Sequence, residues 1–275
     1  MIPYIDLPVF HLGPIPIDPW GTLVCLGFIL GLEMARARGI KTGLDVRDVI
    51  DGIVATVLTG FVVGHLVHVL AYNPQQLQDE GEVFGVHIPA GPYALLRIWA
   101  GFSSFGGFIG AVIGSTLFYK VIRKRDFWPH ADAIMFGFPF GWFFGRLGCF
   151  SVHDHIGRPT DFFLGVQFPG GTRFDLGFLE ALVAAAIGAT FLLLARKPRV
   201  PGTFIAAWGL IYAPARFGLD FLRNTDLRGA DVRWAGFTPA QWGCVVMFGA
   251  SLALLAYLHR KGSEQALSPA RGPAA

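Results

Sequence analysis

The sequence predicts an all-α polytopic membrane protein with about seven transmembrane helices. Of its 275 residues, 53% are hydrophobic and only 15% are charged, against roughly 25% charged residues in soluble domains. The mean hydropathy is +0.52, and the 36 glycines suit helices that pack closely in a bilayer. This composition excludes a disordered chain, a nucleic-acid-binding tail and a secreted disulfide-rich domain, and it does not fit an ordinary soluble enzyme.

Seven segments are long and apolar enough to cross a bilayer, which takes about 20 mostly apolar residues. Three of these segments contain no Asp, Glu, Lys or Arg, and the other four carry a few. The expected spans are 17–35, 52–72, 98–119, 128–145, 176–195, 201–222 and 234–258. We expect residues 1–262 to form one integral membrane domain and residues 263–275 to form a disordered cytoplasmic tail.

Basic residues mark every second loop between the expected spans. The first such loop carries Arg36, Arg38 and Lys41, whereas the next loop, 73–96, has acidic residues and no Lys or Arg. Short loops rich in Lys and Arg stay on the cytoplasmic side of a membrane. We therefore expect the N-terminus outside and the C-terminus in the cytoplasm.

A polar stripe lies in the sixth expected span. Tyr212, Arg216, Asp220 and Arg223 are separated by four, four and three residues, which places them on one face of a helix. Such a stripe cannot face lipid. Because one carboxylate cannot neutralise two guanidiniums, and because guanidinium forks match phosphate oxygens, we expect the stripe to bind an anionic group.

A second polar group follows the fourth expected span, where Arg146 precedes His153, Asp154 and His155. The two histidines share a face only in an extended segment, and the sequence offers no obvious third metal ligand. The three cysteines are far apart and lack the paired spacing of a zinc site. We therefore expect no metal and no cofactor.

A pair of glycines, Gly106 and Gly107, lies in the third expected span. Glycines let another backbone or a lipid chain approach a helix closely. Spacing alone leaves both interpretations open: a lipid site, or helix packing only.

These motifs resemble the prolipoprotein diacylglyceryl transferases, integral membrane enzymes of bacterial lipoprotein maturation, over about residues 10–262. The most specific match is G-R-L-G-x-F followed by an acid and G-R. It covers Gly145–Phe150, Asp154, Gly157 and Arg158, with Cys149 in place of a family Asn and Asp154 in place of a family Glu. The stripe of the sixth span matches a family Arg-x-x-x-Glu-x-x-Arg segment with Asp220 as the acid, and a weaker match runs from Arg173 to Glu180.

The resemblance implies transfer of a diacylglyceryl group from phosphatidylglycerol to the lipobox cysteine of a preprolipoprotein signal peptide. It implies a location in the bacterial cytoplasmic (inner) membrane, with the active site toward the outer leaflet of the lipid bilayer and no role for nucleic acid. The site residues it implies share one task, which is to bind and orient the phospholipid. Arg146 and Arg216 would bind the phosphate with support from Arg223, Asp154 and Asp220 would orient these arginines, Tyr212 would donate a hydrogen bond, and Gly106 and Gly107 would make room for lipid.

One position departs from the family pattern. Family members carry a His immediately before the Gly-Gly pair, where this chain has Phe105. His153 or His155 is then the expected base that deprotonates the substrate thiol, since histidine titrates near neutral pH. Phe105 also leaves open an alternative, a non-catalytic or repurposed paralogue that binds anionic phospholipid through the same arginines.

Overall fold

The computed structural model describes the chain except for residues 14, 84–85, 98–100, 228–232 and 268–275. It divides into two compact units, which are described separately. The first unit combines Met1–Thr42 with Ala131–Ala275, and the second unit is Gly43–His130.

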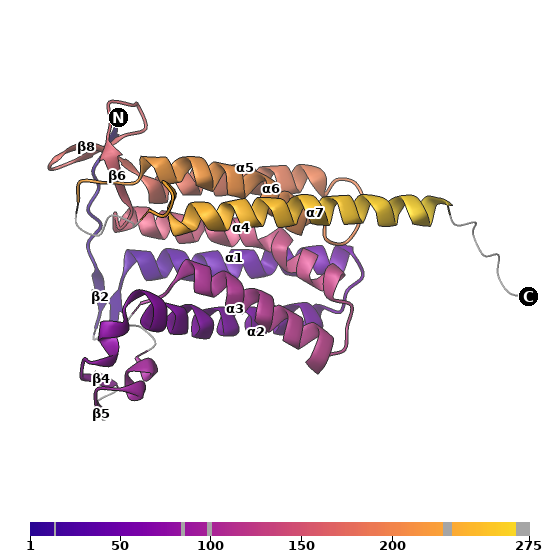
Figure 1. Cartoon of the computed structure of the whole chain (residues 1–275), viewed down its shortest axis with the longest axis horizontal. Coiled ribbons are helices and arrows are strands. Elements are labelled where there is room, and N and C mark those ends of the chain that lie inside the picture. Colours follow the sequence, from indigo (N-terminus) through magenta and orange to yellow (C-terminus); the bar gives the residue numbers. More distant parts are fainter. Residues whose placement is uncertain (14, 84–85, 98–100, 228–232, 268–275) are drawn as a thin grey trace, which may run out of the picture. The chain divides into compact units, whose positions relative to one another are not determined.

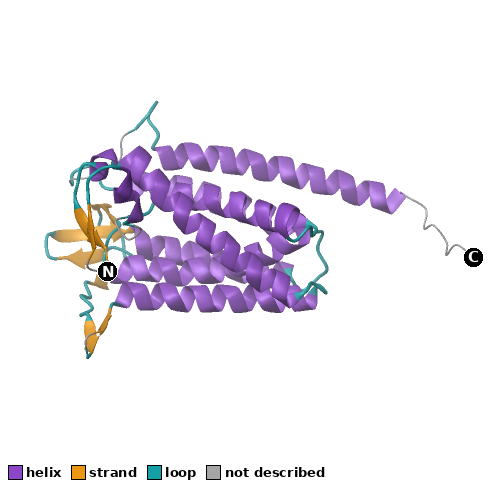
Figure 2. Cartoon of the chain, turned by 90° about the horizontal axis from the view of Figure 1, so that it is seen from below, coloured by secondary structure: helices purple, strands orange, loops and turns teal. Residues whose placement is uncertain are grey.

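Helices that run alongside one another make up most of the first unit, with short strands at one end (Figures 1 and 2). The helices are α1 (Pro19–Lys41), α4 (Phe127–Ser151), α5 (Leu176–Leu194), α6 (Thr203–Leu219) and α7 (Pro239–Leu267). Helices α1 and α4 cross at glycines, because a Cβ atom on Gly137 would lie only 2.2 Å from the carbonyl oxygen of Gly31. An aromatic core that includes Phe136, Phe191 and Phe204 joins α4, α5 and α6.

A four-stranded sheet caps the strand-bearing end of this unit. Its strands are β1 (Ile2–Pro3), β7 (Val166–Phe168), β8 (Gly171–Asp175) and β6 (Ile156–Pro159), in that order across the sheet. Strand β1 is parallel to β7, and the other pairs are antiparallel. The expectation of an all-α fold is wrong here, because strands this short carry too little periodicity to be recognised in the sequence.

Two hairpins add further short strands. In the first unit β2 (Phe10–Leu12) pairs with β3 (Ile15–Ile17) just before α1. In the second unit β4 (Gly81–Val83) pairs with β5 (Val86–Ile88), between 3-10 turns at Pro74–Leu77 and Pro92–Leu96.

Close helix packing defines the second unit. Helix α2 (Val46–Val67) continues as a π-helical turn, His68–Tyr72, and α3 (Ser104–Thr116) continues as another, Leu117–Ile122. The two helices meet at glycines, since a Cβ on Gly110 would lie 2.5 Å from the carbonyl oxygen of Thr59. The Tyr119 hydroxyl adds a buried bond by donating to the carbonyl oxygen of Asp48 at 3.0 Å.

Five helical segments in the described part of the chain are long and apolar enough to cross a membrane: Val46–Tyr72, Ser104–Ile122, Phe127–Ser151, Leu176–Leu194 and Pro239–Arg260. The other two expected spans are also helices, but α1 ends in a charged segment and α6 has only 17 residues. The chain is thus a mostly helical polytopic membrane protein, and the number of seven spans stays a prediction.

Two expected spans begin five or six residues later than predicted. Residues 98–100 lie outside the described residues, and α3 starts at Ser104 because Ser103 caps it, accepting a bond from the Gly106 amide at 3.2 Å. Helix α7 starts at Pro239 rather than 234 because Thr238 caps it. It continues to Leu267, so it includes the first residues of the expected tail, and residues 268–275 are outside the described chain.

Candidate functional site

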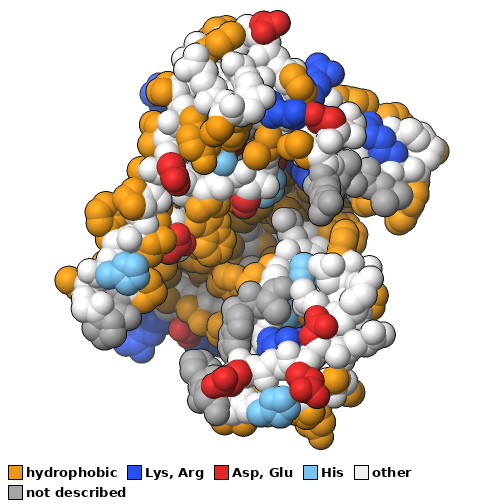
Figure 3. Space-filling view, turned by 90° about the vertical axis from the view of Figure 1, so that its left-hand side faces the viewer, with side chains coloured by type: hydrophobic (Ala, Val, Ile, Leu, Met, Phe, Trp, Pro, Cys, Tyr) orange, Lys and Arg blue, Asp and Glu red, His pale blue; other side chains and the backbone are white. Residues whose placement is uncertain are grey.

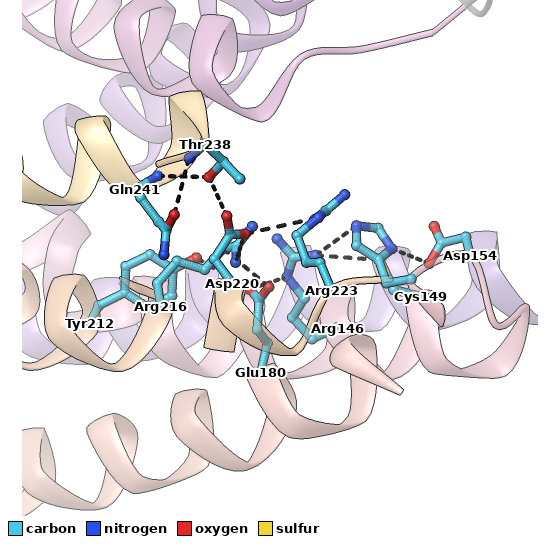
Figure 4. Close-up of polar contacts among 11 residues, drawn as sticks. Arg146, Cys149, Asp154, Glu180, Tyr212, Arg216, Asp220, Arg223, Thr238 and Gln241 are labelled. Atoms are coloured by element: carbon cyan, nitrogen blue, oxygen red, sulfur yellow. Dashed lines mark hydrogen bonds and ion pairs between the residues drawn. The ribbon is translucent and has the colours of Figure 1, made fainter. Parts of the chain in front are cut away.

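Charged residues with little exposure gather in the first unit, where α4 leads to β6 and α5 follows β8. Figure 4 shows the polar contacts among them. Arg146 comes from the last turns of α4, Glu180 from the first turns of α5 and Arg216 from the last turn of α6, while Asp220 follows α6 in the 3-10 turn Asp220–Leu222. None of these four side chains is more than 12% exposed. Figure 3 views this strand-bearing end, where charged side chains and histidines lie among hydrophobic ones.

Glu180 joins the two central arginines. One of its oxygens lies 3.0 Å from Arg146 Nε, and the other lies 3.3 Å from Arg216 Nε. The structure therefore brings Arg146 and Arg216 together, from different helices, on a single carboxylate. The Trp142 ring covers the Arg146 guanidinium at 4.4 Å and shields it.

Asp220 extends the cluster toward α7. Its Oδ1 lies 2.6 Å from Arg216 Nη1 and 3.9 Å from Arg223 Nε, and its Oδ2 accepts a hydrogen bond from the Thr238 hydroxyl. Thr238 and Gln241 cap the helix reciprocally. The backbone N–H of Gln241 donates to Thr238 Oγ1 at 3.2 Å, and the backbone N–H of Thr238 donates to Gln241 Oε1 at 3.0 Å. The start of α7 therefore fixes the position of the Asp220 carboxylate.

The expected helical stripe is wrong at its C-terminal end. Helix α6 stops at Leu219, Asp220 begins the 3-10 turn, and Arg223 has extended backbone. The backbone of Arg223 forms an antiparallel bridge with Gly157 in β6, and the Asn224 side chain donates to the Ile156 carbonyl at 2.9 Å. Pairing with β6 therefore replaces the helical conformation at Arg223, and the Arg223 side chain still lies close to Asp220.

Tyr212 takes a different partner from the one expected. Its buried hydroxyl donates to Glu180 Oε2 at 3.2 Å, so it supports the carboxylate that holds the arginines. The ion pairs of the cluster join three guanidiniums with two carboxylates. Among these five side chains, guanidiniums outnumber carboxylates by one.

A second polar group, Cys149, Asp154 and His155, adjoins Arg146. Arg146 Nη1 lies 3.9 Å from Cys149 Sγ and 3.5 Å from His155 Nε2, and His155 Nδ1 pairs with the Asp154 carboxylate. Burial of the His155 ring by itself lowers its pKa. The hydrogen bonds of the ring to Asp154 and Cys149 outweigh this effect, and the pKa is raised to about 9. Asp154 thus pairs with His155 and reaches Arg146 only through that ring, and its expected role in orienting an arginine stays a prediction.

His153 is buried on the other side of this loop. Its Nδ1 lies 2.7 Å from Asp175 Oδ2, its Nε2 lies 3.2 Å from the Ile5 carbonyl oxygen, and Tyr4 stacks on its ring. Burial raises the pKa of Asp175, and its bond to His153 offsets part of that rise. With both ring nitrogens engaged, His153 fits a structural role better than that of a base.

The glycine pair of α3 lies in the packing of the second unit. A Cβ on Gly106 would lie 2.7 Å from Val67 Cβ, so the small size of Gly106 serves its contact with α2. A Cβ on Gly107 would meet nothing closer than 3.9 Å, and a lipid role there stays a prediction. Phe105 is 55% exposed.

Sequence reasoning missed Glu180, Thr238 and Gln241 as parts of the site. Glu180 has a usable signal, since a carboxylate inside an apolar span needs a partner. Thr238 and Gln241 also have one, because T-P-A-Q combines the two residues of a capping box with a proline at the first helical position.

The family model for prolipoprotein diacylglyceryl transferase matches residues 8–257. The chain belongs to the prolipoprotein diacylglyceryl transferase family. It is 30% identical to the phosphatidylglycerol–prolipoprotein diacylglyceryl transferase of Photobacterium profundum, over 93% of this chain and 94% of that protein. It is 31% identical to the protein of the same name from Bordetella bronchiseptica, over 95% of this chain and 98% of the relative. The resemblance to prolipoprotein diacylglyceryl transferases inferred from the motifs is confirmed.

Proposed function

We propose that this chain transfers a diacylglyceryl group from phosphatidylglycerol to the thiol of a lipobox cysteine in a preprolipoprotein signal peptide, the first step of bacterial lipoprotein maturation. Membership of the transferase family supports the reaction. The observation that carries the site assignment is the meeting of Arg146 and Arg216 on the one carboxylate of Glu180.

The arginine cluster meets the main electrostatic demand of this reaction. The thiolate sulfur bonds to a glyceryl carbon, the bond from that carbon to the phosphate oxygen breaks, and glycerol phosphate leaves with the electron pair. Guanidiniums fixed in advance by Glu180 and Asp220 stabilise the negative charge on the departing phosphate without reorganising. Guanidiniums placed in this way suit an anionic lipid, because their forks match phosphate oxygens.

The same proposal sets the chain in the membrane. Seven helices cross the bacterial inner membrane, with the N-terminus outside, the C-terminus in the cytoplasm and the arginine cluster toward the outer leaflet. The basic end of α1 supports this orientation, since Arg36, Arg38 and Lys41 lie at the helix end that follows the span. The two acyl chains then remain in the bilayer while the headgroup reaches the arginines.

Of the two histidines expected to act on the substrate thiol, we place His155 next to that thiol. It adjoins Arg146, which holds the phosphate in this proposal, whereas His153 is bonded to Asp175 and Ile5.

Phe105 favours a second candidate function, a paralogue that binds anionic phospholipid without catalysis. Complementation of a transferase-depleted bacterial strain separates the two candidates. We expect this chain to rescue growth, and we expect purified Arg146→Lys and Arg146→Ala variants to lose at least about 100-fold in diacylglyceryl transfer, as for loss of one preorganised donor.

The matched control is Arg125→Ala, an exposed arginine of the second unit. It keeps full rescue and full transfer. Full transfer by Arg146→Ala would refute the site assignment. Failure of the unaltered, well-expressed chain to rescue, together with retained phosphatidylglycerol binding, would establish the paralogue.

A further inference from the structure

Three side chains that ligate metals come together beside Arg146. Cys149 lies in the last turn of α4, and Asp154 and His155 lie in the segment that leads to β6. One potential ligand atom from each lies within 4.8 Å of the other two. The Asp154 amide donates to the Cys149 carbonyl at 3.4 Å, and this turn brings the segment back to the cysteine. The third ligand that the sequence did not reveal is therefore Cys149.

We propose that Cys149, Asp154 and His155 bind a divalent cation of the Zn²⁺ type, whose fourth position takes the thiol of the lipobox cysteine. This inference rests on the proposed function. A thiolate, an imidazole and a carboxylate are the ligand types that Zn²⁺ takes, and three protein ligands with one open position are typical of catalytic zinc. The ligand atoms of a tetrahedral zinc site lie about 3.5 Å from one another. Side-chain rotations that move these atoms by about 1 Å would bring the present arrangement to that spacing.

The charge balance of the group suits a divalent cation. A Cys149 thiolate and an Asp154 carboxylate together neutralise the two positive charges of the metal, because His155 has to release its proton before it can bind the metal as a neutral ligand. The loaded site has no net charge and does not repel Arg146, whose guanidinium lies 3.9 Å from Cys149 Sγ and is paired with Glu180 at 3.0 Å.

Such a cation would supply what the transfer reaction needs at this place. The nucleophile is a thiolate, and a thiol that coordinates a metal is deprotonated outright, releasing its proton to water. With the metal held by Cys149, Asp154 and His155, the deprotonated thiol would stand ready as the nucleophile. Its sulfur would bond to the glyceryl carbon as the carbon–oxygen bond to the phosphate breaks and the electron pair leaves on the phosphate oxygen. Arg146 adjoins both groups of residues, so it links the thiol position to the phosphate position.

The choice of residues points the same way. Cys149 offers a sulfur ligand, Asp154 an oxygen ligand and His155 a nitrogen ligand, and these are the three kinds of ligand atom that zinc sites use. An Asn in place of Cys149 would remove the soft ligand. His155 accordingly acts as one of three ligands and not as a solitary base.

Metal binding tests the inference without any activity measurement. The full chain, purified in detergent with phosphatidylglycerol, is incubated with Zn²⁺, desalted and analysed for metal content. We expect about one Zn²⁺ per chain, and at least about tenfold weaker binding in Cys149→Ser, Asp154→Asn and His155→Gln, since each removes one of the ligands. Cys25→Ser and Asp161→Asn, which alter exposed residues, are the matched controls and keep the metal. A chain that binds no Zn²⁺, or ligand variants that bind it as the controls do, would overturn the proposal.

Cobalt tests the role of the fourth position. In chain loaded with Co²⁺, we expect the thiolate-to-cobalt absorption to rise when a lipobox peptide is added and to stay constant when the peptide carries Ser in place of its Cys. An unchanged spectrum with the cysteine peptide would overturn the thiol role. Diacylglyceryl transfer by metal-free chain would overturn the inference and leave the proposed function standing. Metal and thiol binding without transfer would instead refute the proposed function.

Discussion

Two groups of ion pairs in this molecule differ mainly in burial. In the first unit, Glu180 and Asp220 hold Arg146 and Arg216, and no side chain of the four is more than 12% exposed. In the second unit, Asp48 and Asp51 hold Arg123 and Arg125, whose side chains are 43% and 53% exposed. Exposed pairs contribute about 0–1 kcal/mol, whereas buried charges lose hydration that their mutual attraction often fails to restore. Stability alone therefore does not explain the buried group.

The largest expected effect comes from removing the shared carboxylate. Glu180→Gln leaves two buried guanidiniums without their common partner, and we expect it to lower the free energy of unfolding by about 3–5 kcal/mol. Thermal unfolding in detergent measures this. The control is Glu33→Gln, because the Glu33 side chain is 48% exposed and pairs only with nearby Arg36 among the described ion pairs. Equal unfolding temperatures for the two variants would mean that burial does not distinguish the groups.

A middle-sized effect is expected at the start of α7. Thr238→Val removes both the helix cap and the hydrogen bond to the Asp220 carboxylate, and we expect a loss of about 2 kcal/mol. Thr238→Ser keeps the hydroxyl and serves as the matched variant, with thermal unfolding again the measurement. If Thr238→Ser destabilises the chain as much as Thr238→Val, the hydroxyl is not what anchors Asp220.

The smallest effect is expected in the second unit. Arg125→Ala removes an exposed partner of Asp48 while Arg123 remains nearby, and we expect a loss below about 1 kcal/mol. Solvent already screens this pair, so its loss should barely alter the response to salt. We therefore expect high salt to shift the unfolding temperatures of the unaltered chain and of the variant by nearly the same amount. A loss as large as that of Glu180→Gln would show that exposure is the wrong criterion for comparing the two groups.

Much of the arginine site was predictable from local spacing, and the rest was not. The separation of Tyr212, Arg216 and Asp220 predicts one helix face without any knowledge of tertiary structure. The choice of Glu180 as common partner depends on how α4, α5 and α6 pack, which helix periodicity does not specify. The end of α6 at Leu219 depends on a bridge to Gly157, and such a pairing between distant segments leaves no local pattern.

The membrane fold shows the same division. Composition and hydropathy predict long apolar helices because a bilayer demands them. The sheet beside the site is not predictable in this way, because its strands have only two to five residues. Its strand β1 also lies more than 150 residues before the other three strands in the sequence.

The parallel pairing of β1 with β7 has a consequence for biosynthesis. The first strand of the chain acquires its neighbour only after the ribosome has added Val166–Phe168, by which time α1 through α4 have already been made. Long-range pairings of this kind form slowly. The contact of His153 with the Ile5 carbonyl oxygen, which lies next to β1, is thus completed late, after α1 through α4 have been made.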